Sequence, residues 1–218
     1  GLNTVGYKII HMDKKVANKV TATELEIMSQ YLSNYTKAFH VRELARILKA
    51  NHRTISLALQ RLEKRRILEH KMVGKSKTYT LVIRNIITKE YINTAESLKT
   101  MQLVEKHFII KKLLTDISMV MKTTPIILFG SYAKGIERKG SDIDIIVIKD
   151  GNEKKIVSMI KNFAKTFNKR IHVQTVSKKI FEEDINKDHL IIEIVKDHIV
   201  LNNISYFTDV MWRYYNER

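Results

Sequence analysis

Residues 126–148 read IILFGSYAKGIERKGSDIDIIVI, with a Gly-Ser pair after the first apolar run and two aspartates before the second. Short apolar runs bounded by turn residues are typical of buried strands, so we expect strands over 126–129 and 143–148. Between them, residues 131–135 are expected to start a short helix. Strands that alternate with helices in this way indicate an α/β domain.

The residues between the two expected strands have the chemistry of a phosphate and metal site. Gly130 has no side chain where the first strand meets the helix, so a phosphate can approach the backbone there. The helix that begins near Ser131 offers free N–H groups, and the Ser131 hydroxyl can add a hydrogen bond to a phosphate. Asp142 and Asp144 lie two residues apart on a strand, so both carboxylates leave the same face. Paired hard oxygen ligands suit Mg²⁺ (or Mn²⁺).

This combination resembles the minimal nucleotidyltransferases, which are relatives of DNA polymerase β. The resemblance is close over 126–148 and looser over 110–218. It implies a mixed sheet flanked by helices, with Asp142 and Asp144 as catalytic metal ligands and with Gly130, Ser131 and Lys134 at the nucleotide. It also implies transfer of a nucleoside monophosphate from an NTP, with ATP expected, to a hydroxyl group. Taken singly, the Gly-Ser pair and the two aspartates have an alternative interpretation: a Gly-Ser turn and the polar end of a strand.

Ten residues separate the Gly-Ser pair from the first aspartate. The same spacing occurs in the nucleotidyltransferase antitoxins that modify HEPN toxins, so a HEPN-type toxin is one acceptor that the resemblance implies. A small molecule and a nucleic-acid end are the other acceptors, and the sequence does not choose among the three.

The family usually has a third carboxylate on a later strand beside the first two. The corresponding residues here are 169–176, KRIHVQTV, which contain none. His172 or Gln174 falls where that carboxylate is expected, and both should face the aspartates because they share strand parity. His172 can bind a metal or accept a proton, and Gln174 can hold a water. The alternative function is a DNA-binding regulator whose catalytically impaired nucleotidyltransferase domain only senses nucleotide.

The remaining periodicity completes a two-domain protein of mixed α+β and α/β class. We expect a domain over 1–83, a helical linker over 84–122 and the nucleotidyltransferase domain over 123–218. The last of these should continue with helices over 153–167, 178–186 and 189–196, strands over 170–176 and 199–201, and a terminal helix with apolar residues between Phe207 and Tyr215.

The N-terminal part has the pattern of three helices followed by a β-hairpin. Apolar residues recur at helical spacing over 23–32, 40–48 and 52–62, and Asn51 is a good N-cap for the third helix. Strands over 67–73 and 78–82 should flank a hairpin tip at 74–77. This order, over residues 21–83, resembles the winged helix-turn-helix of archaeal and bacterial regulators.

The net charge of +16 is concentrated in this part. Residues 37–89 hold 14 basic and 3 acidic side chains, a net charge of +11, whereas residues 121–218 carry only +4. Such an excess suggests a polyanion, so we expect the third helix to enter the major groove of duplex DNA. A protein-docking module is the alternative. The expected DNA-binding residues are Arg53, Thr54, Ser56, Gln60, Arg61, Lys64, Lys75 and Lys77.

Composition excludes several classes of protein. The chain has no cysteine, so disulfides, thiolate catalysis and cysteine-ligated zinc are excluded. The apolar runs are too short to span a bilayer, and residues 1–10 lack the layout of a signal peptide. We therefore expect a cytoplasmic protein with no membrane partner; a homodimer is a further expectation.

Overall fold

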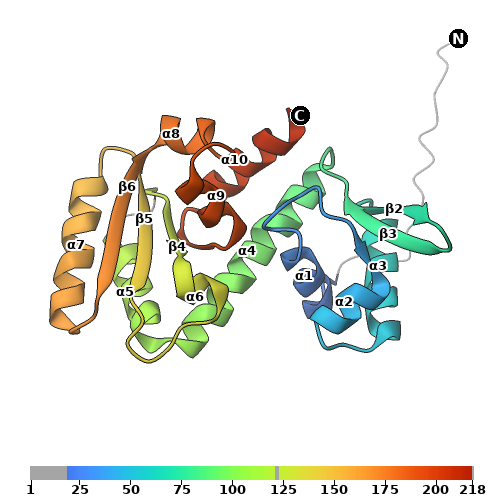
Figure 1. The fold of residues 1–218 in the computed structure, drawn as a ribbon, viewed down its shortest axis with the longest axis horizontal. Helices are drawn as coiled ribbons and strands as arrows, with labels where there is room; N and C mark the ends of the chain where they lie inside the picture. The colour runs from blue at the N-terminus through green and yellow to red at the C-terminus, as the bar shows by residue number, and fades with distance from the viewer. Residues whose placement is uncertain (1–18, 121–122, 218) are drawn as a thin grey trace, which may run out of the picture.

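The computed structural model describes residues 19–120 and 123–217 (Figure 1). Within them, one group of elements precedes α4 and a second group follows α5. The elements before α4 are α1 (Ala22–Ser29), β1 (Phe39–His40), α2 (Val41–Ile47), α3 (His52–Lys64), β2 (Leu68–Val73) and β3 (Ser76–Leu81). The two linking helices are α4 (Ile86–Lys106) and α5 (Phe108–Val120).

The N-terminal helices begin where the sequence supplies caps. Thr21 and Glu24 form a capping box at the start of α1, and the Asn51 side chain accepts from the Arg53 N–H at the start of α3. The apolar face of α3 is buried, as its spacing predicts. The three expected helices and the hairpin are therefore all present.

The hairpin completes a three-stranded antiparallel sheet in the order β1-β3-β2. Val73 pairs with Ser76, so the turn has two residues, and Gly74 adopts a φ of 60° there. That conformation favours glycine because it has no Cβ. The hairpin tip projects from the end of the sheet that is distant from α4 (Figure 1).

A second sheet, in the order β6-β5-β4-β7, forms the C-terminal part. Its strands β5 and β6 are parallel, and the other pairs are antiparallel, so the sheet is mixed as predicted. The elements of this part are β4 (Ile126–Phe129), α6 (Gly130–Lys134), β5 (Ile143–Lys149), α7 (Glu153–Thr166), β6 (Ile171–Ser177), α8 (Lys178–Glu183), α9 (His189–Lys196), β7 (Ile199–Asn202) and α10 (Ile204–Asn216).

Helices cover both faces of this sheet (Figure 1). Ile143, Ile145 and Val147 point to the face that packs against α5 and α7. Ile146 and Ile148 point to the opposite face, which packs against α8, α9 and α10. By strand alternation, Asp142 and Asp144 belong to this second face, at the start of β5.

Helix α4 packs against elements of both groups. Tyr91, Ile92 and Ala95 belong to one buried cluster that also contains residues of α1, α3 and α10. Tyr35, from the loop after α1, stacks on Tyr215 of α10 with ring centroids 4.8 Å apart. The domain boundaries stay predictions, and residues 1–18, 121–122 and 218 of the three expected segments lie outside the described residues.

Two buried carboxylates reinforce these contacts. Glu24 is fully buried, with Oε1 at 2.6 Å from Arg61 Nε and Oε2 at 2.9 Å from Arg65 Nη1. Glu96 of α4 is also fully buried, and its Oε1 lies 2.8 Å from Nε2 of the buried His198, just before β7. The first group fastens α3 to α1, and the second fastens α4 to the start of β7.

Candidate active site

Gly130 lies at the junction of β4 and α6, directly against a carboxylate of the neighbouring strand. Phe129 pairs with Asp144 across β4 and β5, and Gly130 follows with a φ of 70°. A Cβ built on Gly130 would lie 3.2 Å from Asp144 Cγ and closer still to Asp144 Oδ2. The backbone conformation and the close approach of Asp144 both require glycine here.

Replacing Gly130 with alanine should therefore displace the Asp144 carboxylate. If Asp144 is the catalytic metal ligand that the resemblance implies, nucleotide transfer should fall at least about 100-fold, because misplacing a catalytic group by about 1 Å can cost that much. The same substitution at Gly135, where a Cβ would meet nothing within 4 Å and φ is 68°, is the control for backbone strain alone. Equal activities of the two alanine variants would contradict a special role for the Gly130–Asp144 contact.

His172 lies beside both aspartates. Parallel pairing of β5 with β6 aligns His172 with Asp144. Its Nε2 is 3.7 Å from Asp142 Oδ2, and its Nδ1 is 3.3 Å from Asp144 Oδ1. The side chain of His172 is 62% exposed, whereas those of Asp142 and Asp144 are 28% and 27% exposed. The prediction that His172 or Gln174 faces the pair is confirmed for His172, while Gln174 aligns with Ile146 farther along the strand.

Arg170 is a member of this cluster that the sequence analysis missed. Its Nε lies 2.7 Å from Asp142 Oδ1, and its Nη2 donates to the carbonyl oxygen of Gly140 at 2.8 Å. Asp142 Oδ1 is buried, and no N–H group is aligned with it well enough to form a hydrogen bond. Arg170 therefore balances the charge of Asp142 but leaves Oδ1 without a hydrogen bond. The signal was available, because Arg170 and His172 are two residues apart and so share a face.

The donors at this site fit a divalent cation in part. Asp142 and Asp144 supply two hard oxygen donors on one face, and the Oδ1 atom of Asp142 still lacks a hydrogen-bond donor. Within residues 19–120 and 123–217, no group of three or more His, Asp or Glu side chains has the geometry to hold a metal ion. A cation here would consequently need other ligands, such as water or substrate phosphates, besides the two carboxylates.

The other residues expected at the nucleotide lie on or after α6. Ser131 follows Gly130 in α6 and is partly buried. Lys134 is exposed in the last turn, and it lines a cavity against α4 with Lys99 and Lys106. Arg138 donates its backbone N–H to Ser141 Oγ at 2.8 Å, which closes the loop before Asp142.

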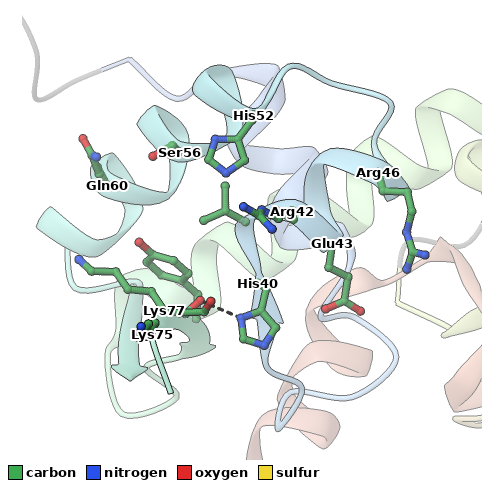
Figure 2. A pocket seen from close by; sticks show the side chains of 12 residues that line it. His40, Arg42, Glu43, Arg46, His52, Ser56, Gln60, Lys75 and Lys77 are labelled. Carbon is green, nitrogen blue, oxygen red and sulfur yellow. Dashed lines mark hydrogen bonds between the residues drawn. The ribbon is translucent and has the colours of Figure 1, made fainter. Parts of the chain in front are cut away.

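The N-terminal part carries a second candidate site, a groove between α2, α3 and the hairpin (Figure 2). Its volume is about 970 Å³. Four of the residues expected to bind DNA line it: Ser56 and Gln60 from α3, and Lys75 and Lys77 from the hairpin. The groove also contains residues that the sequence analysis did not select, namely His40, Arg42, Glu43, Arg46 and His52.

His40 connects the two walls of this groove. Its Nδ1 lies 3.1 Å from the carbonyl oxygen of Lys77, the contact drawn as a dashed line in Figure 2. The lining has four Arg or Lys side chains and one carboxylate, Glu43. The groove is accordingly a basic surface.

The remaining expected DNA-binding residues differ in exposure: three are exposed on α3, and one is only partly exposed. Arg53, Thr54 and Lys64 are exposed on α3. Arg61 is only partly exposed, because its guanidinium group pairs with buried Glu24. The ion pair gives Arg61 a structural partner that α3 alone does not reveal, and its contact with DNA stays a prediction.

Comparisons with known proteins bear on the C-terminal site. Residues 109–201 match the family model of the nucleotidyltransferase domain. No curated protein matches the chain. One similar solved structure is described as a toxin–antitoxin with AMP-PNP; it is 22% identical, the match covers 50% of this chain and 86% of that one, and the TM-score is 0.32.

A second similar structure is TrmBL2, an archaeal chromatin protein described as showing a novel mode of DNA binding. It is 15% identical, the match covers 79% of this chain and 68% of that one, and the TM-score is 0.26. At such identities and TM-scores, neither structural similarity says anything about function. The match over 109–201 includes Gly130, Asp142, Asp144 and His172.

Proposed function

We propose that this protein transfers a nucleoside monophosphate from ATP, in the presence of Mg²⁺ or Mn²⁺, to a hydroxyl group. The observation that carries the proposal is the approach of Asp144 to Gly130, with Asp142 beside it, within the residues that match the nucleotidyltransferase domain. Gly130 lets the Asp144 carboxylate approach the backbone at the start of α6, and two neighbouring carboxylates attract a divalent cation.

Each residue of the site has a task that its position suits. Gly130 admits the Asp144 carboxylate beside the backbone, and Ser131 donates its hydroxyl to a phosphate oxygen. Asp142 and Asp144 would hold the divalent ion. When bound, such an ion neutralises the phosphate charge and lowers the pKa of an oxygen nucleophile. Arg170, whose side chain is 73% exposed, could then leave Asp142 Oδ1 and pair with a phosphate oxygen.

His172 would orient the acceptor. Its Nδ1 lies 3.3 Å from Asp144 Oδ1, whereas its Nε2 lies 3.7 Å from Asp142 Oδ2, beyond hydrogen-bond length, so Nε2 can turn to an acceptor hydroxyl. It lies where the family usually has a third carboxylate.

The direct test is transfer of label from ATP. The full chain is incubated with Mg²⁺, ATP labelled at the α-phosphate and a cell lysate, and labelled acceptors are separated. We expect label on a defined acceptor, dependent on divalent metal. Parallel incubations with ATP labelled at the γ-phosphate distinguish nucleotidyl from phosphoryl transfer. Label from the γ-phosphate alone would contradict the proposal.

A second function, nucleotide sensing without transfer, has its own support. Arg170 already neutralises Asp142, and the position opposite Asp144 is a histidine rather than a carboxylate. A regulator of this kind should bind ATP with Mg²⁺ and change its affinity for DNA, yet label no acceptor.

A HEPN-type toxin as the acceptor, a homodimer and a cytoplasmic location stay predictions. In the described part of the chain, no helix combines the length and hydropathy that crossing a bilayer requires.

For the N-terminal part, we propose binding of duplex DNA by a winged helix-turn-helix. The element order, the exposed polar face of α3 and the basic groove beside the hairpin support this. Arg53, Thr54 and Gln60 can read base edges, and Lys64, Lys75 and Lys77 suit phosphates. A protein-docking surface would not need such a charge excess.

DNA affinity should fall steeply as salt rises, and a Lys75→Ala, Lys77→Ala double variant should weaken that dependence. If both lysines contact phosphates, the slope of log affinity against log salt should become shallower by about two units, since each contact contributes about 0.9. Fluorescence anisotropy with labelled duplexes measures this. Lys155→Ala, at an exposed position of α7 in the other part of the chain, is the control and should keep the slope. Absence of duplex binding even at low salt would make the groove a protein-docking surface.

A further inference from the structure

A small cavity lies between α4 and α6, apart from the aspartate pair. Its volume is about 250 Å³. From α4, four residues at positions i, i+3, i+4 and i+7 line it, which is one face of a helix: Lys99, Gln102, Leu103 and Lys106. From the other side, residues 132–135 and Glu137 complete the wall, with His107 at the break between α4 and α5.

The lining has an excess of positive charge. Lys99, Lys106 and Lys134 face one carboxylate, Glu137. The Oε1 atom of Glu137 lies 3.1 Å from His107 Nε2, and its Oε2 is buried without a hydrogen-bond partner. Glu137 is therefore engaged with the histidine at the rim and is not paired with any of the three lysines in the described contacts.

The helix dipole does not account for Lys99 as it does for the other two lysines. Lys106 and Lys134 lie in the last turns of α4 and α6, where the helix dipole favours a cation. Lys99 lies about two turns before the end of α4, and its Nζ donates to the carbonyl oxygen of His198 at 2.5 Å. Burial lowers the pKa of Lys99, although Glu96 and Asp197 act in the opposite direction. An anion in the cavity would compensate this desolvated ammonium group.

We propose that this cavity binds a phosphate group, held by Lys99, Lys106 and Lys134 with Gln102 as a further donor. Pockets that enclose a whole drug-sized ligand usually measure about 300–1,000 Å³, so this one suits a phosphate or diphosphate rather than a complete nucleotide. It lies at the opposite end of α6 from Gly130. The phosphate can therefore belong to a phosphorylated acceptor or to the tail of the nucleotide.

Binding of inorganic phosphate and pyrophosphate to the full chain tests the proposal without any transfer reaction. Line broadening of the ³¹P resonances during titration reports binding even at millimolar affinity. A Lys106→Gln, Lys134→Gln double variant should bind at least about tenfold more weakly, since it loses two charge-assisted hydrogen bonds. Both lysines are exposed, so the variant should keep its fold, which circular dichroism checks.

Lys111→Gln, at an exposed position on α5 outside the cavity, is the matched control and should bind as the unmodified chain does. Binding that is absent, or that falls equally in the control and in the double variant, would overturn the proposal. Failure of nucleotide transfer would leave this result unaffected.

A competition experiment identifies the source of the phosphate. If ATP with Mg²⁺ displaces inorganic phosphate, the cavity receives the tail of the nucleotide. If phosphate and ATP bind together, the cavity receives a phosphate of the acceptor. Either result supports the cavity as a phosphate site, provided that the double variant weakens phosphate binding in the same experiment.

Discussion

Replacing Asp142 and Asp144 together with asparagine is expected to abolish metal-dependent nucleotide transfer. Asparagine keeps the size of each side chain but removes the negative charge that attracts a divalent ion. A catalytic metal contributes several kcal/mol to transition-state stabilisation, and about 1.36 kcal/mol corresponds to a tenfold rate change. We therefore expect transfer to fall at least about a thousandfold.

Calorimetry with ATP, with and without Mg²⁺, measures the binding part of this prediction. The double variant should lose the increase in affinity that Mg²⁺ gives to the unmodified chain. Asp184→Asn is the matched control, because Asp184 lies after α8 and its ion pair with Lys187, at 4.0 Å, is long. If the double variant keeps both its ATP affinity and its metal dependence, the aspartate pair is not the metal site.

Replacing Glu24 with glutamine is expected to destabilise the N-terminal part by about 3–5 kcal/mol, the usual cost of removing one partner of a buried ion pair. Glu24 is fully buried between two guanidinium groups, and Arg65 Nη1 also donates to Tyr91 Oη at 2.7 Å. Without the carboxylate, the charge of Arg65 would stay largely buried and unpaired. The capping contact from Thr21 N–H to Glu24 Oε2 would weaken as well.

Urea denaturation followed by circular dichroism measures this loss. Glu26→Gln, two residues along α1 and partly exposed, makes the same chemical change without a buried partner and should cost well under 1 kcal/mol. Similar losses for the two variants would mean that the Glu24 ion pairs contribute little. Because Arg61 pairs with Glu24, it is unsuitable for testing DNA binding. An Arg61→Glu substitution would place two carboxylates together and disturb the fold.

Much of the secondary structure could be predicted from local signals. The Asn51 side chain accepts from a free N–H group at the start of α3, whatever lies around it. The helical spacing of Ile55, Leu59 and Leu62 likewise predicts that they form the buried face of α3. Strand alternation placed Asp142 and Asp144 on one face and Ile143 in the core.

Strand parity predicts which side chains share a face, but it could not predict the alignment and distances of residues on different strands. That His172 aligns with Asp144, and that Arg170 reaches Asp142, depends on the parallel register of β5 and β6, whose strands are separated by α7. Strand parity identifies which side chains share a face, but only the packing of α7 on the sheet sets how far one strand slides along the other.

The amino-acid sequence by itself determined the helices and strands, the aspartate pair and the excess of basic residues before α4, because each depends on neighbours along the chain. Only the tertiary structure decided that Gly130 lies against Asp144, that Glu24 is buried between Arg61 and Arg65, and that Lys99 shares a cavity with Lys134. These three arrangements bring together residues of different elements. The distances between these residues are set by the packing of whole helices and sheets, which cannot be predicted from the pattern of neighbouring residues along the chain.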